Sequence, residues 1–323
     1  MTTPNAHLPQ ISAIIPTCGR TELLLNCVAS IISGNYEDYE ILVIDQDPSQ
    51  QLLHGLAQRF PGERRLRYFF LDRAGASSAR NLGLQEARCE IVAFIDDDAV
   101  ADPAWLQAIH EAFLAFQPPP ALIAGRIDPI WPGKRPEWYP QEREYLLGLY
   151  NIGDELRSMP EHDQPVGANM AGLRQVILAL GGFDQNLGPN YFRKRPMVTG
   201  EDALLGRRAR QAGYSVLYQP RARVCHQISA AKLRRRYFLR RHFWEGVTIV
   251  TEMQSLGELG PGKRGHLVYH AKVIAKSLVL ALLPNLRRKD GYPSSALRML
   301  ALSRAACSLG TIYGVLTLDA LAG

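Results

Sequence analysis

The chain has 323 residues, 46% of them hydrophobic and 21% charged, a balance typical of a globular protein with a substantial core. Five scattered cysteines, none spaced like a zinc site, argue against a disulfide framework and favour a reducing compartment. The net charge is +6 and most of the excess follows residue 190, so the two parts of the chain are expected to meet different partners.

Strands and helices alternate through the first 116 residues. Strands are predicted at 11–17, 40–44, 66–71 and 90–95, and helices at 20–33, 50–59, 77–87 and 102–116. This alternation predicts an α/β fold with a mostly parallel sheet and helices on both faces. Ligands bind such sheets beyond the carboxyl ends of the strands, which is where Thr17, Asp45, Asp72 and Asp96 fall.

The pattern changes after three prolines at 118–120. Strands are predicted at 121–130, 166–173, 214–218 and 222–225, and helices at 174–180 and 201–212. The irregular segment 129–163 is too long for a simple connector. Its aromatic residues Trp131, Trp138 and Tyr139 favour a folded pocket wall, with local core packing as the alternative.

Three consecutive carboxylates, Asp96, Asp97 and Asp98, close the apolar run at 90–95. Like charges this close repel unless a cation or a set of donors lies among them. Because side chains alternate along a strand, Asp96 and Asp98 are expected to face the same way and to suit Mg²⁺ or Mn²⁺ shared with a phosphate-bearing substrate. Alternatively, Asp102 caps the following helix, an explanation that extends to Asp98 but not to Asp96.

Several spaced motifs now occur in order. They are Pro16-Thr17-Cys18-Gly19-Arg20, Asp45, Gly75 through Arg80-Asn81, Asp96-x-Asp98 and, about a hundred residues later, Glu201-Asp202. Over residues 11–228 this arrangement resembles the family 2 glycosyltransferases with the GT-A fold. The resemblance implies a catalytic domain, 1–228, that moves a sugar from a nucleotide donor to an acceptor hydroxyl with inversion and with a metal ion.

The resemblance also implies where the nucleotide sugar binds. The expected donor site consists of Pro16, Thr17, Arg20, Asp45, Gly75, Arg80 and Asp96. From the residues alone two alternatives stay open: a solvated Arg20, and a surface ion pair of Arg80 with Asp72 or Glu86. The donor is expected to be a UDP-, GDP- or dTDP-sugar.

The same resemblance implies which residues bind the metal ion and which one is the general base. Asp98 is expected to bind Mg²⁺ or Mn²⁺, Asp96 to contact ribose or a metal-bound water, and His226 to complete the metal shell. Asp202 is the expected general base, with Glu201 supporting it or binding acceptor. The alternatives are a structural histidine and two acids that merely favour the first turn of a helix.

Asn169 is a further candidate from the sequence. It is a candidate for the sugar or acceptor pocket, and an ordinary strand-end turn is the alternative.

Residues 229–323 are predicted to form a second, helical domain. Basic residues interleave with aromatics at 232–241, and 273–283 and 299–318 are predicted to be amphipathic or shallowly inserted helices. Because no secretory signal is recognised in the first ten residues, we expect a cytoplasmic protein that contacts the inner face of an anionic membrane peripherally. A helical cap with a solvated basic face is the alternative, and no nucleic acid partner is expected.

These expectations combine into one predicted activity, a glycosyltransferase that acts on a glycan or lipid-linked acceptor such as a polysaccharide precursor. A sugar nucleotidyltransferase would share the nucleotide-binding sheet and the carboxylates. A non-catalytic, membrane-associated binder of nucleotide sugars is the third possibility.

Overall fold

The computed structural model describes residues 10–73, 75–189, 197–259, 263–283 and 292–317. The chain divides into two compact units. The first comprises Met1–Ile130, Gly148–Gln185 and Glu201–Gln227, and the second comprises Trp131–Leu147, Asn186–Gly200 and Ile228–Gly323. The chain therefore passes several times from one unit to the other, for the last time after Gln227.

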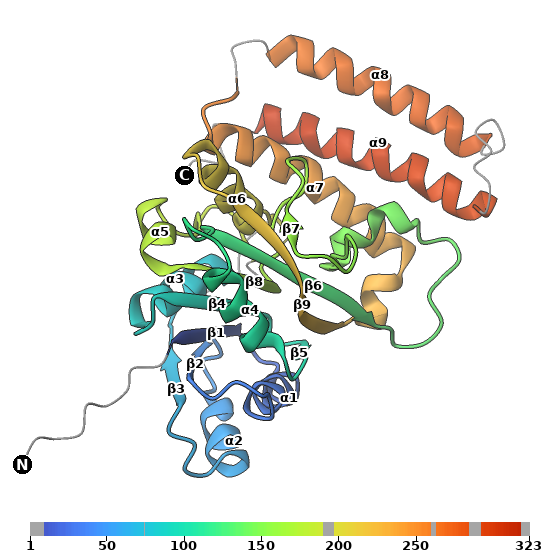
Figure 1. Ribbon diagram of the computed structural model, residues 1–323. Helices are drawn as coiled ribbons and strands as arrows, with labels where there is room; N and C mark the ends of the chain where they lie inside the picture. Colours follow the sequence, from blue (N-terminus) through green and yellow to red (C-terminus); the bar gives the residue numbers. More distant parts are fainter. Residues whose placement is uncertain (1–9, 74, 190–196, 260–262, 284–291, 318–323) are drawn as a thin grey trace, which may run out of the picture. The chain divides into compact units, whose positions relative to one another are not determined.

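A nine-stranded sheet forms the centre of the first unit, in the order β3-β2-β1-β4-β8-β6-β9-β5, with β7 paired to β9 (Figure 1). The strands are β1 (Ile11–Thr17), β2 (Tyr39–Asp45), β3 (Leu66–Phe70), β4 (Ile91–Ile95), β5 (Ala99–Ala101), β6 (Leu122–Ile130), β7 (Arg157–Ser158), β8 (Asn169–Leu173) and β9 (Val216–Gln227). Strands β3, β2, β1 and β4 are parallel neighbours, and β6 is parallel to β9. The antiparallel strand β8 joins these two parts.

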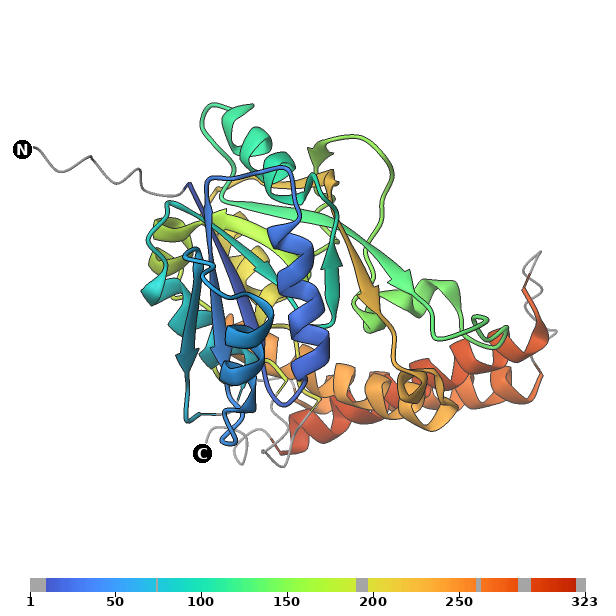
Figure 2. The ribbon, with the colours of Figure 1, turned by 90° about the horizontal axis from the view of Figure 1, so that it is seen from below.

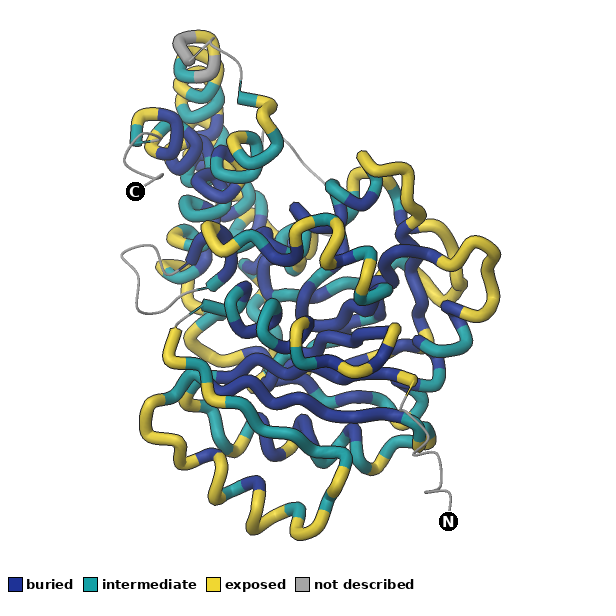
Figure 3. Tube along the Cα trace, turned by 90° about the vertical axis from the view of Figure 1, so that its left-hand side faces the viewer, coloured by how far each residue is buried: buried dark blue, intermediate teal, exposed yellow. Residues whose placement is uncertain are grey.

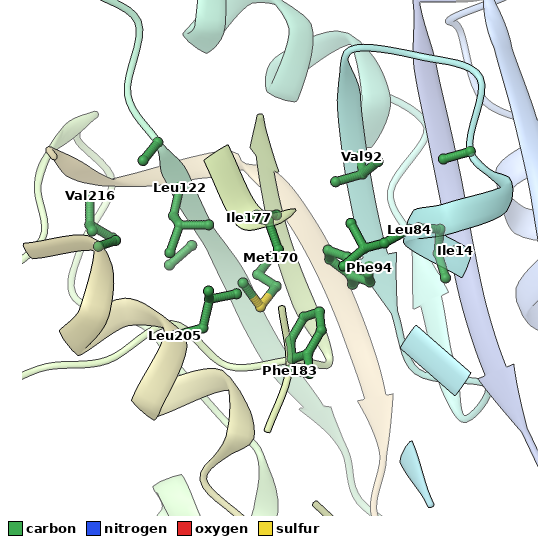
Figure 4. Packing of buried hydrophobic residues seen from close by; sticks show 14 of the residues in the cluster. Ile14, Leu84, Val92, Phe94, Leu122, Met170, Ile177, Phe183, Leu205 and Val216 are labelled. Atoms are coloured by element: carbon green, nitrogen blue, oxygen red, sulfur yellow. The ribbon is translucent and has the colours of Figure 1, made fainter. Parts of the chain in front are cut away.

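Helices cover the sheet on both faces, as predicted (Figure 2). They are α1 (Thr21–Ile32), α2 (Gln51–Arg59), α3 (Ala76–Glu86), α4 (Trp105–Leu114), α5 (Arg174–Ala179) and α6 (Glu201–Gln211). Ile14, Phe94, Met170, Phe183 and Leu205 are among the residues of one buried cluster, which joins β1, β4 and β8 to α6 (Figure 4). Continuous apolar runs make these strands fully buried, as Figure 3 shows for the sheet.

Strand register brings the sequence motifs to one edge of this sheet. Thr17 pairs with Asp45 at the ends of β1 and β2, and β4 runs parallel to β1 on its other side. The carboxyl ends of three adjacent strands therefore meet, and the acidic triplet follows directly after the last of them.

Two local predictions around the triplet are wrong. Strand β4 ends at Ile95, so Asp96, Asp97 and Asp98 lie in a turn between β4 and β5, where the alternation of strand side chains does not apply. Asp102 is not the N-cap of helix α4, which begins at Trp105 after Ala104. The Asp102 side chain accepts a hydrogen bond from the Ala104 amide at 3.0 Å.

One further difference lies at the far side of the sheet. The two strands predicted at 214–218 and 222–225 are one strand, β9, whose register against β6 shifts at Gly125/Arg126.

The second unit contains three long helices, α7 (Arg235–Ser255), α8 (Lys263–Leu282) and α9 (Ser294–Leu316), and the 3₁₀ helices η1 (Gln141–Leu147) and η2 (Ala230–Leu233). Helix α9 packs against both α7 and α8. Glycines permit the close approach of α7 and α9, because a Cβ on Gly310 would lie 1.8 Å from the Phe243 carbonyl oxygen. Among the described helices, α9 alone has the length and apolarity to cross a membrane, and half of that stretch is buried in the protein.

Candidate active site

The central carboxylate of the triplet, Asp97, is fully buried behind the other two. Its Oδ2 accepts a hydrogen bond from the Thr17 hydroxyl at 2.7 Å, and its Oδ1 lies 3.1 Å from Nη2 of Arg20. Burial raises the pKa of the Asp97 carboxyl to about 7, against the opposing effect of the Arg20 guanidinium. The hydrogen bond between Thr17 and Asp97 thus links the end of β1 to the segment that follows β4.

Asp98 lies between two nitrogen-bearing side chains. Its Oδ2 accepts a 2.7 Å hydrogen bond from Nη1 of Arg20, and its Oδ1 is 3.0 Å from Nε2 of His226. The short strand β5 produces this contact, because Ala99 pairs opposite His226 in β9. Gly148, with φ +76°, packs on the imidazole: an added Cβ would approach its Cε1 to 3.2 Å.

Arg80, on α3, joins the triplet to the Glu201-Asp202 pair. Its Nη2 donates to Oδ1 of Asp96 at 2.9 Å, and its Nη1 donates to Oε1 of Glu201 at 2.5 Å. The guanidinium is buried and lies over the Phe183 ring. The prediction of a surface ion pair for Arg80 is therefore wrong. From its buried position the guanidinium supports the acidic triplet through Asp96.

Glu201 and Asp202 are the first two residues of α6. Oδ2 of Asp202 accepts from the Gly167 amide at 2.6 Å and Oδ1 from the Ala203 amide at 2.8 Å, so the carboxylate is held in a fixed orientation. Glu201 is buried, and burial together with the neighbouring Asp202 raises the pKa of its carboxyl, which the Arg80 guanidinium counteracts.

The other predicted donor residues lie around the same edge. Pro16 is in β1, and Gly75, with φ +127°, precedes α3. Asp45 is fully buried; it accepts hydrogen bonds from the Asp47 amide at 3.0 Å and from the Tyr68 hydroxyl at 2.9 Å. Direct contact of Asp45 with a nucleotide stays a prediction, since each carboxylate oxygen can accept a further hydrogen bond.

Asn169 has a structural role in this geometry. Its Oδ1 accepts from the Trp105 indole at 2.8 Å, and its Nδ2 donates to the carbonyls of Arg126 and Ala222. The side chain is buried and its amide is fully engaged, so it joins strands instead of facing a ligand.

The predicted aromatic wall belongs to the second unit. Trp138 and Tyr139 pack edge-on against Phe238 of α7, at centroid distances of 5.6 and 4.9 Å. Both predictions for these residues have support, because Tyr139 is buried in this cluster while Trp138 also lines an open cavity. The cavity has a volume of about 510 Å³ and is lined by Lys134, Arg135, Pro136, Glu137, Trp138, Arg235 and Ser295.

Two residues of the site were not singled out for these roles by sequence reasoning. Gly167 contacts both Arg80 and Asp202: a Cβ there would lie 2.8 Å from Nη2 of Arg80 and 3.3 Å from Oδ2 of Asp202. Tyr68, in β3, supports Asp45. No local motif distinguishes either residue, since each contact joins strands and loops that are distant in sequence.

A divalent ion has an incomplete protein site here. Within the described ranges no group of three or more His, Cys, Asp or Glu side chains is arranged to hold a metal. Oδ1 of Asp98 and Nε2 of His226 are nevertheless 3.0 Å apart, so these two atoms could hold one ion together. Two protein ligands suit an ion whose other positions go to substrate phosphates and water.

Residues 12–180, more than half of the chain, match the family model described as Glycosyl transferase family 2. A glucosyl-dolichyl phosphate glucuronosyltransferase of Haloferax volcanii is 26% identical over 319 residues, which cover 95% of this chain and 97% of that protein. A GalNAc(5)-diNAcBac-PP-undecaprenol beta-1,3-glucosyltransferase of Campylobacter jejuni is 32% identical over 93 residues, 28% of this chain and 30% of the relative.

A solved structure shares the fold. The mannosyltransferase of Pyrobaculum calidifontis, in complex with GDP-mannose and Mn²⁺, matches with a TM-score of 0.53 at 17% identity, covering 98% of this chain and 77% of the other. The architecture is the GT-A fold that the sequence predicted. With its sheet-edge carboxylates and its family match, the chain belongs to glycosyl transferase family 2 and is a glycosyltransferase.

Proposed function

We propose that the enzyme transfers a sugar from a nucleoside diphosphate donor to a hydroxyl of a lipid-linked acceptor, with inversion and with a divalent metal ion. The single observation that carries this proposal is Arg80, whose guanidinium bridges Asp96 of the triplet and Glu201 beside Asp202. One buried cation thus links the group expected at the donor to the pair expected at the acceptor.

The donor site is proposed at the ends of β1, β2 and β4 and the start of α3. Pro16, Thr17 and Asp45 would form the base and ribose side, and Gly75 and Arg80 the side toward the diphosphate, with Arg20 beside the acids. Helix amides and cationic side chains favour phosphate oxygens. The nucleotide stays open among UDP, GDP and dTDP.

Asp98 and His226 are the proposed metal ligands, with Asp96 placed to contact ribose or a metal-bound water. Carboxylate oxygen and imidazole nitrogen are both suitable ligands for Mn²⁺, and carboxylate is preferred by Mg²⁺. A bound ion would neutralise charge on the diphosphate of the donor. The Arg20 guanidinium, which donates to Oδ2 of Asp98, offsets part of the charge of this carboxylate.

Asp202 is the proposed general base. Its two oxygens are fixed by the Gly167 and Ala203 amides, so a lone pair is held in one direction at the start of α6. Asp202 takes the proton of the acceptor hydroxyl as that oxygen bonds to the anomeric carbon. The bond from this carbon to the diphosphate oxygen breaks on the opposite side, and the nucleoside diphosphate leaves with the electron pair. Glu201, paired to Arg80, holds Asp202 at the site.

The acceptor class is inferred from relatives whose names specify lipid-linked substrates. The basic residues after 231 support the same inference, since the substrate's lipid would be held at a membrane. We therefore place the enzyme at the cytoplasmic face of a membrane, in peripheral contact with it.

A donor screen followed by a product assay tests this proposal. Thermal unfolding is recorded with each nucleotide sugar, with and without Mn²⁺ or Mg²⁺. The expected result is stabilisation that requires both metal and one donor, about 2.7 kcal/mol at a hundredfold excess over Kd. Incubation with a lipid-phosphate-linked sugar should then release nucleoside diphosphate. Release of pyrophosphate would instead identify a nucleotidyltransferase, and turnover unchanged by chelators would contradict the metal assignment.

A further inference from the structure

One side of helix α8 is apolar and exposed. Tyr269, Val279 and Leu282 are 62%, 53% and 77% exposed, and Val268 and Leu278 are exposed on the same side. At about 3.6 residues per turn, these five positions fall within half of the helix circumference. In a helix that faces water, this half would be polar.

The opposite side of α8 packs against α9. Ser277 and Ala281 are buried there, and Nδ1 of His270 lies 3.1 Å from the Ser308 hydroxyl of α9. A strip of large aliphatic side chains that are exposed together is ordinarily covered by protein or by lipid. The exposed side of α8 therefore needs a partner.

Charge indicates which partner this is. Lys272 and Lys276, one turn apart, are exposed on this same half, between Val279 and Tyr269 around the helix. The aliphatic side chains therefore form a strip with cations along one edge, and the α8 sequence contains no Asp or Glu. After Glu258 the sequence contains nine Lys and Arg and two acidic residues, Asp290 and Asp319. An apolar strip with cations along its edge matches the boundary of an anionic bilayer, where phosphates lie beside acyl chains.

We propose that the exposed side of α8 lies in the interfacial layer of an anionic membrane, parallel to its surface. Val268, Val279 and Leu282 enter the acyl boundary, while Lys272 and Lys276 extend to the phosphates. The proposal names the element behind the membrane contact of the proposed function, and in that respect it rests on that function.

Vesicle co-sedimentation of the full chain tests the proposal without donor or acceptor. The vesicles contain phosphatidylcholine with or without phosphatidylglycerol. The double variant Val279→Glu/Leu282→Glu should lower the partition coefficient by at least about tenfold, because two side chains that bury apolar area in the lipid become charged. Lys272→Gln/Lys276→Gln should lower it about fivefold for each lysine, on phosphatidylglycerol vesicles alone.

The matched control is Leu114→Glu. Leu114 is the last residue of α4 in the first unit and is 67% exposed, so this variant makes the same change away from α8. It should bind vesicles like the wild type. Thermal unfolding of each variant checks that the fold is kept.

Two results would overturn the proposal. One is equal vesicle binding by wild type and Val279→Glu/Leu282→Glu. The other is a wild-type dimer, seen by light scattering, that this variant converts to monomer while neither binds vesicles; the apolar side would then join two copies. Failure of the proposed function is separate: vesicle binding would persist while no lipid-linked acceptor is glycosylated.

Discussion

Arg241 donates a hydrogen bond from Nη2 to Oγ1 of Thr199 at 2.7 Å. The Thr199 amide in turn donates to Oγ1 of Thr248 at 3.1 Å, so two residues of α7 hold the chain just before Glu201. Gly200, with φ +98°, leaves no space beside α7, because a Cβ would lie 2.1 Å from Oε1 of Glu252. Helix α7 therefore fixes the backbone at Thr199 and Gly200, the two residues that precede Glu201 in the chain.

Replacing Thr248 by valine should slow catalysis without weakening donor binding. The variant removes the acceptor for the Thr199 amide, and a small displacement of the chain before Asp202 misplaces the base. We expect kcat to fall about tenfold while KM for the donor is unchanged. Thr251→Val is the control, since its hydroxyl bonds only within α7, to the Val247 carbonyl. Equal kinetics for the two variants would show that α7 does not position the base.

Asp202→Asn should abolish transfer and keep the donor bound. The amide keeps one oxygen, which can accept from either the Gly167 or the Ala203 amide, and it cannot take a proton. We expect kcat to fall about 10²- to 10⁴-fold, with donor-dependent thermal stabilisation preserved. Glu111→Gln, which alters an exposed ion pair with Arg221, serves as the control. Wild-type turnover by Asp202→Asn would remove the base from the mechanism.

Gly167→Ala tests whether Arg80 and Asp202 need their present positions. The added methyl group would lie 2.8 Å from Nη2 of Arg80, which is buried and cannot withdraw freely. We expect kcat to fall at least about tenfold, because both the base and its supporting cation shift. Gly133→Ala is the matched control, since nothing lies within 4 Å of its added Cβ. Similar activity of the two alanine variants would contradict this account.

Sequence patterns predicted the parallel part of the sheet well. Strands β1, β2 and β4 are continuous apolar runs that end in polar residues, so both their burial and their carboxyl ends could be inferred. Parallel pairing then required Thr17, Asp45 and the acidic triplet to gather at one edge, as they do. These features depend on local pattern and on a general rule of topology.

The contacts inside the site could not be inferred in this way. Strand β5 has three residues directly after three acids, too short to show a pattern, yet its pairing with β9 places His226 beside Asp98. Arg80 has acidic neighbours in the sequence, Asp72 and Glu86, but bonds to Asp96 and Glu201 instead. Tertiary packing decides these partners, and no local signal records it.

His242 gives the second unit a predictable response to acid. The residue is buried in α7, its Nδ1 donates to the Phe238 carbonyl at 2.8 Å, and its ring packs on Phe238. Burial, together with the Arg143 and Arg241 guanidinium groups, lowers the pKa of the imidazole to about 4, against the opposing effect of the Phe238 carbonyl. The fold therefore holds His242 neutral.

Unfolding restores the ordinary histidine pKa of about 6.5, so the unfolded chain binds a proton that the folded chain refuses. Stability from this residue is complete above pH 6.5 and is lost as the pH falls toward 4, by about 2 kcal/mol at pH 5. His242→Phe should remove that part of the pH dependence in thermal unfolding between pH 7.5 and 5. His162→Gln, at an exposed position, should leave the profile of the wild type intact. A His242→Phe profile identical to the wild type would mean that His242 is also protonated in the folded protein at pH 5. The hydrogen bond from Nδ1 to the Phe238 carbonyl would then have to stabilise the charged imidazole.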